Sequence, residues 1–170
     1  MGRARSASPA PERRPRRKKA VSTGTPHRPA TVAQVADRVA DFLIDQGLAP
    51  ERSGDGPFVI RFGSTVVMVQ VFEAERRPWV RIASVVLTGF RPSLDLLVRI
   101  LHLNTQVVTG AFLLFEDDTL SFATTLPGED LAPEAFRIAL LSVARVSDDL
   151  DDELQALAGG RRAVDLVEPG

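Results

Sequence analysis

Apolar residues recur at the spacing of one helical face in three segments of the chain. The first segment follows Thr31, which forms a capping-box pattern with Gln34 three residues later. The second spans Leu94–Asn104, with Pro92 suited to its first turn, and the third is a long segment with Pro133 near its start. The second helix is apolar around so much of its circumference that we expect it to be covered on more than one side.

Alternating apolar positions between the first and second helices predict a β-hairpin and a third strand. Phe58–Phe62 and Thr65–Phe72 flank a two-residue turn at Gly63-Ser64, and Trp79–Leu87 follows. Pairing across this turn gives one apolar core face. Its residues are Phe58, Ile60, Phe62, Val67, Val69 and Val71. The opposite face is mixed rather than polar and holds Val59, Arg61, Val66, Met68, Gln70 and Phe72.

A second hairpin is predicted over Ala111–Glu116 and Thr119–Leu126, with Asp117-Asp118 as a two-residue turn. This register places four residues on the core face, namely Leu113, Phe115, Leu120 and Phe122. The same register places Phe112, Leu114, Ser121 and Ala123 on the opposite face.

The resulting order, α-β-β-β-α-β-β-α, predicts an α+β fold with a five-stranded antiparallel sheet and helices packed mainly on one face. At 170 residues the chain is long enough for one domain with a substantial core. We expect a basic, disordered tail over residues 1–30, the α+β domain over residues 31–158, and a frayed end over residues 159–170.

Charge and composition separate the tail from the domain. Residues 1–30 contain nine Arg or Lys and one acidic residue, about +8, whereas the remainder contains 12 basic and 21 acidic residues, about −9. The chain has no cysteine, which excludes disulfides and thiolate metal sites. It has no apolar run of membrane-spanning length and no apolar signal core, so a cytoplasmic protein is expected. The abundance of Ala, Arg, Gly, Pro and Val indicates GC-rich coding DNA, as in an actinobacterium.

The sequence contains no recognisable constellation for catalysis, a cofactor or a metal ion. His102 is the only histidine of the predicted domain and lies among leucines, so an interface position is favoured over a general base. The glycines near Asp55 are followed by no Lys-Ser/Thr pair, which excludes a phosphate-binding loop. The acidic turn at Glu116 could bind a cation weakly, but a solvated turn is favoured. We therefore expect a protein that is not an enzyme.

The apolar and turn pattern over residues 31–157 resembles the YbjN-like family, which is related to type III secretion chaperones of the CesT kind. The most specific matching segments are Leu97–Asn104, Gly110–Leu114, Asp118–Leu120, Leu126-Pro127 and Ser147–Leu154. The resemblance implies a type III secretion chaperone-like fold, a homodimer, and binding of a protein or peptide segment without ATP. The basic tail falls outside it.

Apolar surface in excess of what one core can bury predicts two binding surfaces. The expected dimer interface on the second helix consists of Leu96, Ile100 and Leu103. The expected peptide-binding face of the sheet consists of Val59, Val66, Met68, Phe72, Phe112 and Leu114.

The basic tail allows an alternative function as a nucleic-acid-associated protein. Its candidate phosphate contacts are Arg13, Arg14, Arg16, Arg17, Lys18 and Lys19. The tail could equally be a solvated segment, or it could be absent from the product if Val21 corresponds to a GTG start codon. The partners expected from the sequence are therefore a second copy of the chain, a protein or peptide client, and, less favoured, nucleic acid.

Overall fold

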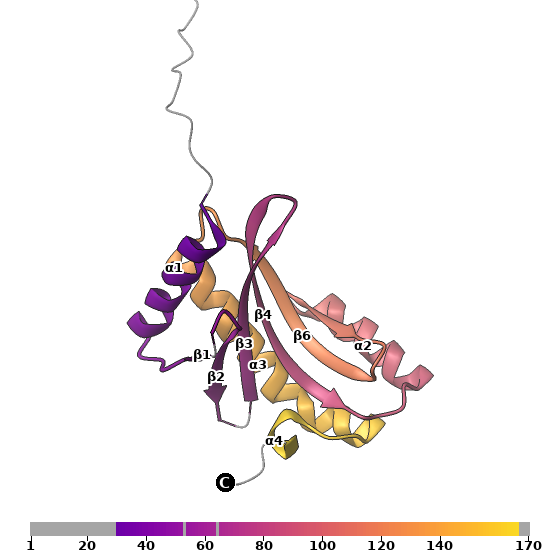
Figure 1. Cartoon of the computed structure of the whole chain (residues 1–170). Coiled ribbons are helices and arrows are strands. Elements are labelled where there is room, and N and C mark those ends of the chain that lie inside the picture. The colour runs from indigo at the N-terminus through magenta and orange to yellow at the C-terminus, as the bar shows by residue number, and fades with distance from the viewer. Residues whose placement is uncertain (1–29, 53, 64, 167–170) are drawn as a thin grey trace, which may run out of the picture.

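The computed structural model describes residues 30–52, 54–63 and 65–166, and it is a mixed α+β structure built on one antiparallel sheet (Figure 1). The elements follow in the order α1 (Val32–Asp45), β1 (Glu51–Arg52), β2 (Phe58–Phe62), β3 (Thr65–Ala74), β4 (Arg77–Thr88), α2 (Leu94–Gln106), β5 (Ala111–Leu114), β6 (Thr119–Pro127), α3 (Pro133–Ala158) and α4 (Ala163–Leu166).

The sheet has the strand order β1-β2-β3-β4-β6-β5, and every neighbouring pair is antiparallel. In Figure 1, α3 runs behind the twisted sheet. The apolar faces of α1, α2 and α3 form one continuous core with the inward side chains of β2 to β6. We call the helix-covered side of the sheet its inner face and the opposite side its open face. The predicted antiparallel α+β class is confirmed, although the sheet has six strands rather than five.

The first hairpin has the predicted register. Phe62 pairs with Thr65, and Phe58 pairs with Val69, which places the core residues of both strands on the inner face. Ser64 of the predicted turn lies outside the described residues. The capping box of α1 is also confirmed, because the side chains of Thr31 and Gln34 each accept a hydrogen bond from the other residue's backbone N–H.

The predicted register of the second hairpin is wrong by one residue. Phe112 pairs with Phe122 and Leu114 with Leu120, and the connection consists of residues 116–118 instead of two aspartates alone. The backbone N–H of Phe115 donates to the carbonyl of Thr119 at 2.9 Å. Asp118 has a φ of 56°, a left-handed conformation that aspartate tolerates in three-residue hairpin loops.

Two short segments at the margins of the domain were not predicted. Strand β1 pairs with β2 through Glu51 and Arg52, which carry no apolar alternation. At the other end, the expectation that the chain frays from residue 159 is wrong for residues 159–166. Arg161 and Thr88 exchange two backbone hydrogen bonds of 2.8 and 2.9 Å. Gly160 makes this approach possible, because a Cβ there would lie 2.7 Å from the Thr88 carbonyl oxygen.

Candidate functional site

The open face of the sheet carries more apolar surface than a solvated face requires. Four residues predicted for a peptide-binding face lie on it and are half-buried, namely Val59, Val66, Met68 and Phe72. Val59, Met68, Ala83, Ala123 and Ala111 form one continuous row across five strands.

The structure corrects the remaining two residues of the predicted peptide-binding face. Phe112 is 4% exposed and packs in the core beside Phe122, with 4.9 Å between ring centroids. Leu114 pairs with Leu120 and therefore faces the helix side as well. The one-residue change in register brings Leu113 to the open face in place of these two, and Phe115 follows it two residues along the chain.

A groove of about 250 Å³ lies on the open face. Small side chains, Ala83, Ser121 and Ala123, lie in the middle of its lining, where their size leaves the space. Larger apolar side chains border this floor. They are Met68 of β3, Leu113 of β5, and Phe115 beyond the end of β5, which is 48% exposed. The sequence pattern correctly placed Ser121 and Ala123 on this face but left them out of the predicted peptide-binding residues, although their small size among larger neighbours was a usable signal.

One end of the groove is polar and is formed by Gln70 and Arg81. The guanidinium carbon of Arg81 lies 5.2 Å from the centroid of the Phe72 ring. Its Nε–H also donates to the hydroxyl oxygen of Thr125 on β6, at 3.4 Å. Trp79 pairs with Phe72 on the same face and donates its indole N–H to the carbonyl of Ala74 at 3.1 Å. A ring and a hydroxyl thus hold the arginine head at this end.

The exposed edge of the sheet at β5 is partly closed by Asn104 of α2. Its Oδ1 accepts a hydrogen bond from the backbone N–H of Phe112 at 2.7 Å, and its Nδ2 donates to the carbonyl of the same residue at 3.4 Å. Asn104 therefore occupies two of the backbone groups of β5 with which another strand would pair, the N–H and C=O of Phe112. This edge is consequently less available for pairing with a further strand.

Helix α2 presents a second apolar surface to solvent. The three residues predicted as a dimer interface, Leu96, Ile100 and Leu103, are 0–6% exposed inside the domain, so that assignment is wrong by a rotation of the helix. The outward stripe consists instead of Leu94, Leu97, Val98 and Leu101, which are 38–76% exposed. The helix begins at Leu94, as expected, and continues to Gln106. Pro92 lies before it rather than in its first turn, because Ser93 is the N-cap and its hydroxyl oxygen accepts a hydrogen bond from the N–H of Leu96 at 3.2 Å.

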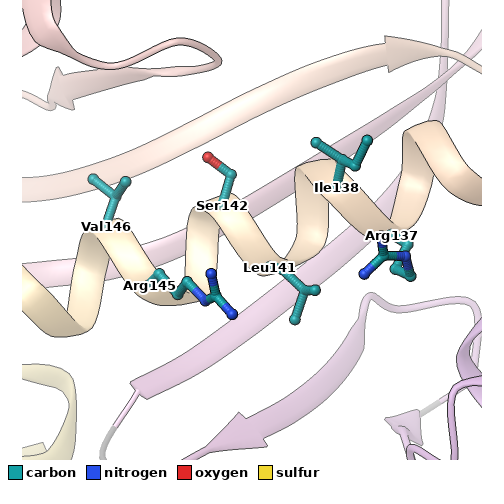
Figure 2. Close-up of a pocket in the computed structure, with 6 residues that line it drawn as sticks. All are labelled: Arg137, Ile138, Leu141, Ser142, Arg145 and Val146. Carbon is teal, nitrogen blue, oxygen red and sulfur yellow. The ribbon is translucent and has the colours of Figure 1, made fainter.

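A shallower hollow of about 410 Å³ lies along the outer side of α3 (Figure 2). Figure 2 shows its six residues in two rows, Ile138, Ser142 and Val146 on one side and Arg137, Leu141 and Arg145 on the other. Arg137 forms a two-point ion pair with Glu134, and Ser142 bonds to Thr109 at 3.0 Å. Only one helix lines this hollow, whereas the open-face groove is lined from four strands and two loops.

The titratable residues that the structure describes bear on the candidate chemistry of the sequence. His102 lies exposed on α2, and within residues 30–166, where described, no group of three or more His, Cys, Asp or Glu side chains could hold a metal ion. Burial raises the pKa of Asp151 on α3, although a backbone hydrogen bond from Asp152 opposes this. The described part of the chain contains no helix long and apolar enough to cross a bilayer. The basic residues from Arg13 to Lys19 lie outside the described residues.

The domain is thus an α+β sheet covered by helices on one face, with a groove bordered by apolar side chains on the other. A family model described as "T3SS (YopN, CesT) and YbjN peptide-binding chaperone 1" matches residues 30–166. The chain belongs to this family, which confirms the resemblance found in the sequence.

The fold agrees with a solved member of this structural group. The crystal structure of YbjN from E. coli matches with a TM-score of 0.54 at 14% sequence identity, and the match covers 69% of this chain and 92% of that chain. At this identity the likeness shows the shared fold alone. Among curated proteins, no sequence matches this chain significantly. Membership of a peptide-binding chaperone family supports a chaperone or adaptor role.

Proposed function

We propose that this protein is a chaperone-like adaptor that binds a protein or peptide segment on the open face of its sheet. The observation that carries the proposal is the apolar groove of about 250 Å³ on a face that α1, α2 and α3 leave uncovered. Four hydrogen-bonded strands position most of its lining. Such a groove needs little ordering when a segment binds, which lowers the entropic cost of association.

The exposed fractions of the groove residues indicate a modest affinity for a single apolar side chain of a bound segment. Leu113 is 37% exposed and Phe115 48% exposed, and Met68 is half-buried. Burying a fully exposed side chain of this size stabilises a complex by about 1.5–3 kcal/mol, so each of these partly buried residues offers about 1 kcal/mol. Lost translational and side-chain freedom offsets much of this gain. We therefore expect micromolar or weaker binding, which suits a client that must later be released.

The proposed cycle uses no nucleotide. The glycines of the loop before β2, Gly54 and Gly56, lead into a strand, whereas a phosphate-binding loop leads into a helix whose N-terminal N–H groups hold the phosphate. Binding and release are proposed to follow from affinity and client concentration alone.

We further propose that the protein works as a homodimer through the outer stripe of α2. Leu94, Leu97, Val98 and Leu101 follow the i, i+3, i+4, i+7 spacing, so the stripe can pack against the same stripe of a second copy about a twofold axis. Arg99 is turned away from it and pairs with Glu153 of α3 at 2.6 Å. The guanidinium of Arg99 therefore does not interrupt the apolar surface of the stripe.

Sedimentation tests the dimer. The wild type is expected to sediment as a dimer at about tens of micromolar, a range in which modest interfaces still hold. Leu97→Glu and Leu101→Glu should each shift it toward the monomer without lowering the melting temperature, because both side chains are exposed. Ile138→Glu on α3 is the matched control. A monomeric wild type at this concentration would contradict the proposal.

Capture of an unfolded reporter protein tests the open face. Light scattering would follow aggregation of a chemically unfolded reporter with and without the wild-type protein, which should suppress it. Met68→Asp and Leu113→Asp place a charge in the groove and should abolish most of the suppression. Ile138→Asp, in the hollow of α3, is the matched control and should retain it. Equal suppression by wild type and both groove variants would remove the open face from consideration.

A further inference from the structure

The open face of the sheet is basic although the domain as a whole is acidic. Three arginines lie on it by strand register, Arg61 on β2 and Arg77 and Arg81 on β4, and all three are exposed. The acidic residue that register places on this face is Glu51, at the β1 edge. Residues 31–170 together carry about nine more negative than positive charges. This sorting of charge gives the groove a preference for an anionic ligand.

Arg81 is the arginine that lines the groove, and it is held without an internal anionic partner. None of the ion pairs among the described residues involves Arg61, Arg77 or Arg81, whereas Arg99, Arg137 and Arg162 are all paired with carboxylates. The Phe72 ring and the Thr125 hydroxyl position the guanidinium of Arg81. A guanidinium positioned in this way keeps further N–H groups for a carboxylate, which it can bind through two parallel hydrogen bonds.

The opposite end of the groove has the opposite charge. Phe115 leads directly into Glu116 and Asp117, and these acidic residues border a hollow next to the groove. Register places Arg81 beside Thr125 and Phe115 beside Thr119, six residues apart on β6 or about 20 Å along the strand. A bound segment therefore meets a cation at one end and carboxylates at the other. The small residues Ala83 and Ala123 lie between these ends, one row of side chains from Arg81.

We propose that the groove selects a protein segment with a bulky apolar side chain and a carboxylate spaced two residues apart. The apolar side chain fills the space above Ala83 and Ala123, and the carboxylate pairs with Arg81. Two residues of extended chain span about 7 Å, which matches one row of the sheet. This inference rests on the proposed function, because it names the chemistry of the client for the same groove.

Selection from a random peptide library displayed on phage tests this preference on the full-length protein. Peptides that bind wild type but not Met68→Asp are sequenced, and one is labelled for fluorescence anisotropy. We expect these peptides to be enriched in Asp or Glu two residues from Phe, Leu, Ile, Met or Trp. Arg81→Gln should lower the affinity for the labelled peptide about three- to tenfold, which is the range expected for losing a partly exposed, charge-assisted hydrogen-bonded pair. Arg145→Gln, on the hollow of α3, should leave its affinity unchanged.

Exchanging the charges of Arg81 and of the peptide gives an independent test of the carboxylate preference. Arg81→Glu should prefer the same peptide with lysine in place of its carboxylate, which a merely structural role of Arg81 would not produce. Circular dichroism melts of both Arg81 variants confirm that they fold, as the exposure of this side chain predicts.

The remaining outcomes separate this inference from the function on which it rests. The selected peptides, whose binding depends on Met68, could show no enrichment in Asp or Glu, or could bind Arg81→Gln as tightly as wild type. Either result would overturn the carboxylate preference and leave the proposal of peptide binding intact. If no library peptide depends on Met68, both fail. If a short duplex DNA displaces the labelled peptide and its own binding depends on Arg81, the open face is a phosphate-binding surface and the inference is overturned.

Discussion

Asn104 offers the sharpest test of how the edge of this sheet is protected. Replacing it with alanine removes both side-chain hydrogen bonds to the backbone of Phe112, at 2.7 and 3.4 Å. The shorter bond carries most of the energy, because 3.4 Å is near the limit of a useful interaction. Losing it leaves a partly buried N–H without its partner, which costs about 1–2 kcal/mol.

The gain in helix propensity offsets part of this loss. Asn104 lies within α2, where alanine is favoured over asparagine by about 0.5 kcal/mol. We therefore expect Asn104→Ala to lower the free energy of unfolding by about 0.5–1.5 kcal/mol. For a domain of this size, each kcal/mol corresponds to about 3–4 °C, so the melting temperature should fall by about 2–6 °C.

Thermal unfolding and amide exchange together identify the cause. Thr105→Ala is the matched control, because it gains the same kind of helix propensity and its hydroxyl bonds only within α2, to the carbonyl of His102. The control should melt at or slightly above the wild-type temperature. Hydrogen exchange at the Phe112 amide should be faster in Asn104→Ala and unchanged in the control. An unchanged melt together with a still protected Phe112 amide would refute the role of Asn104.

Three further outcomes follow from the sequence and the structure. Asp151→Asn should stabilise the protein at neutral pH, because burial raises the pKa of this carboxyl above its ordinary 3.8. The wild-type folded state therefore loses stability as the pH rises from 3.8 through the raised pKa, and a stability gain of the variant that persists below pH 3.8 in chemical denaturation would contradict this. His102→Ala should alter sedimentation more than melting, because the side chain is exposed beside the proposed dimer stripe; a turnover activity lost with His102 would contradict the expectation from the sequence that the protein is not an enzyme. A product comprising residues 21–170 should melt within about a degree of the full chain, because the removed segment has no apolar periodicity to bury; a loss of several degrees in calorimetry would contradict this.

The sequence alone determined those elements whose ends carry their own local chemistry. The capping box at Thr31 defined the start of α1, and Pro133 occupies the first turn of α3 as predicted. The two residues between Phe62 and Thr65 fixed the register of the first hairpin, and with it the division of both strands into inner and open faces. In each case the signal lies within a few residues, so no distant contact was needed to interpret it.

Tertiary contacts decided the elements whose local pattern was ambiguous. The aspartates at 117 and 118 fit either a two- or a three-residue turn, and the better burial of Phe112 against Phe122 selects the latter. Helix α2 is apolar around nearly its whole circumference, so the spacing of its apolar residues does not indicate which side faces the core. Packing on the sheet places Ile100 inside and Leu101 outside.

The groove itself also belongs to the tertiary structure. Met68, Ala83 and Ser121 lie far apart in the sequence, and only the β3-β4-β6 order brings them onto one surface. Its charge arises in the same way, because Arg61, Arg77 and Arg81 share a face only once the strands pair. Alternation within a strand shows which residues share a side, but the neighbouring strand determines what those residues form together.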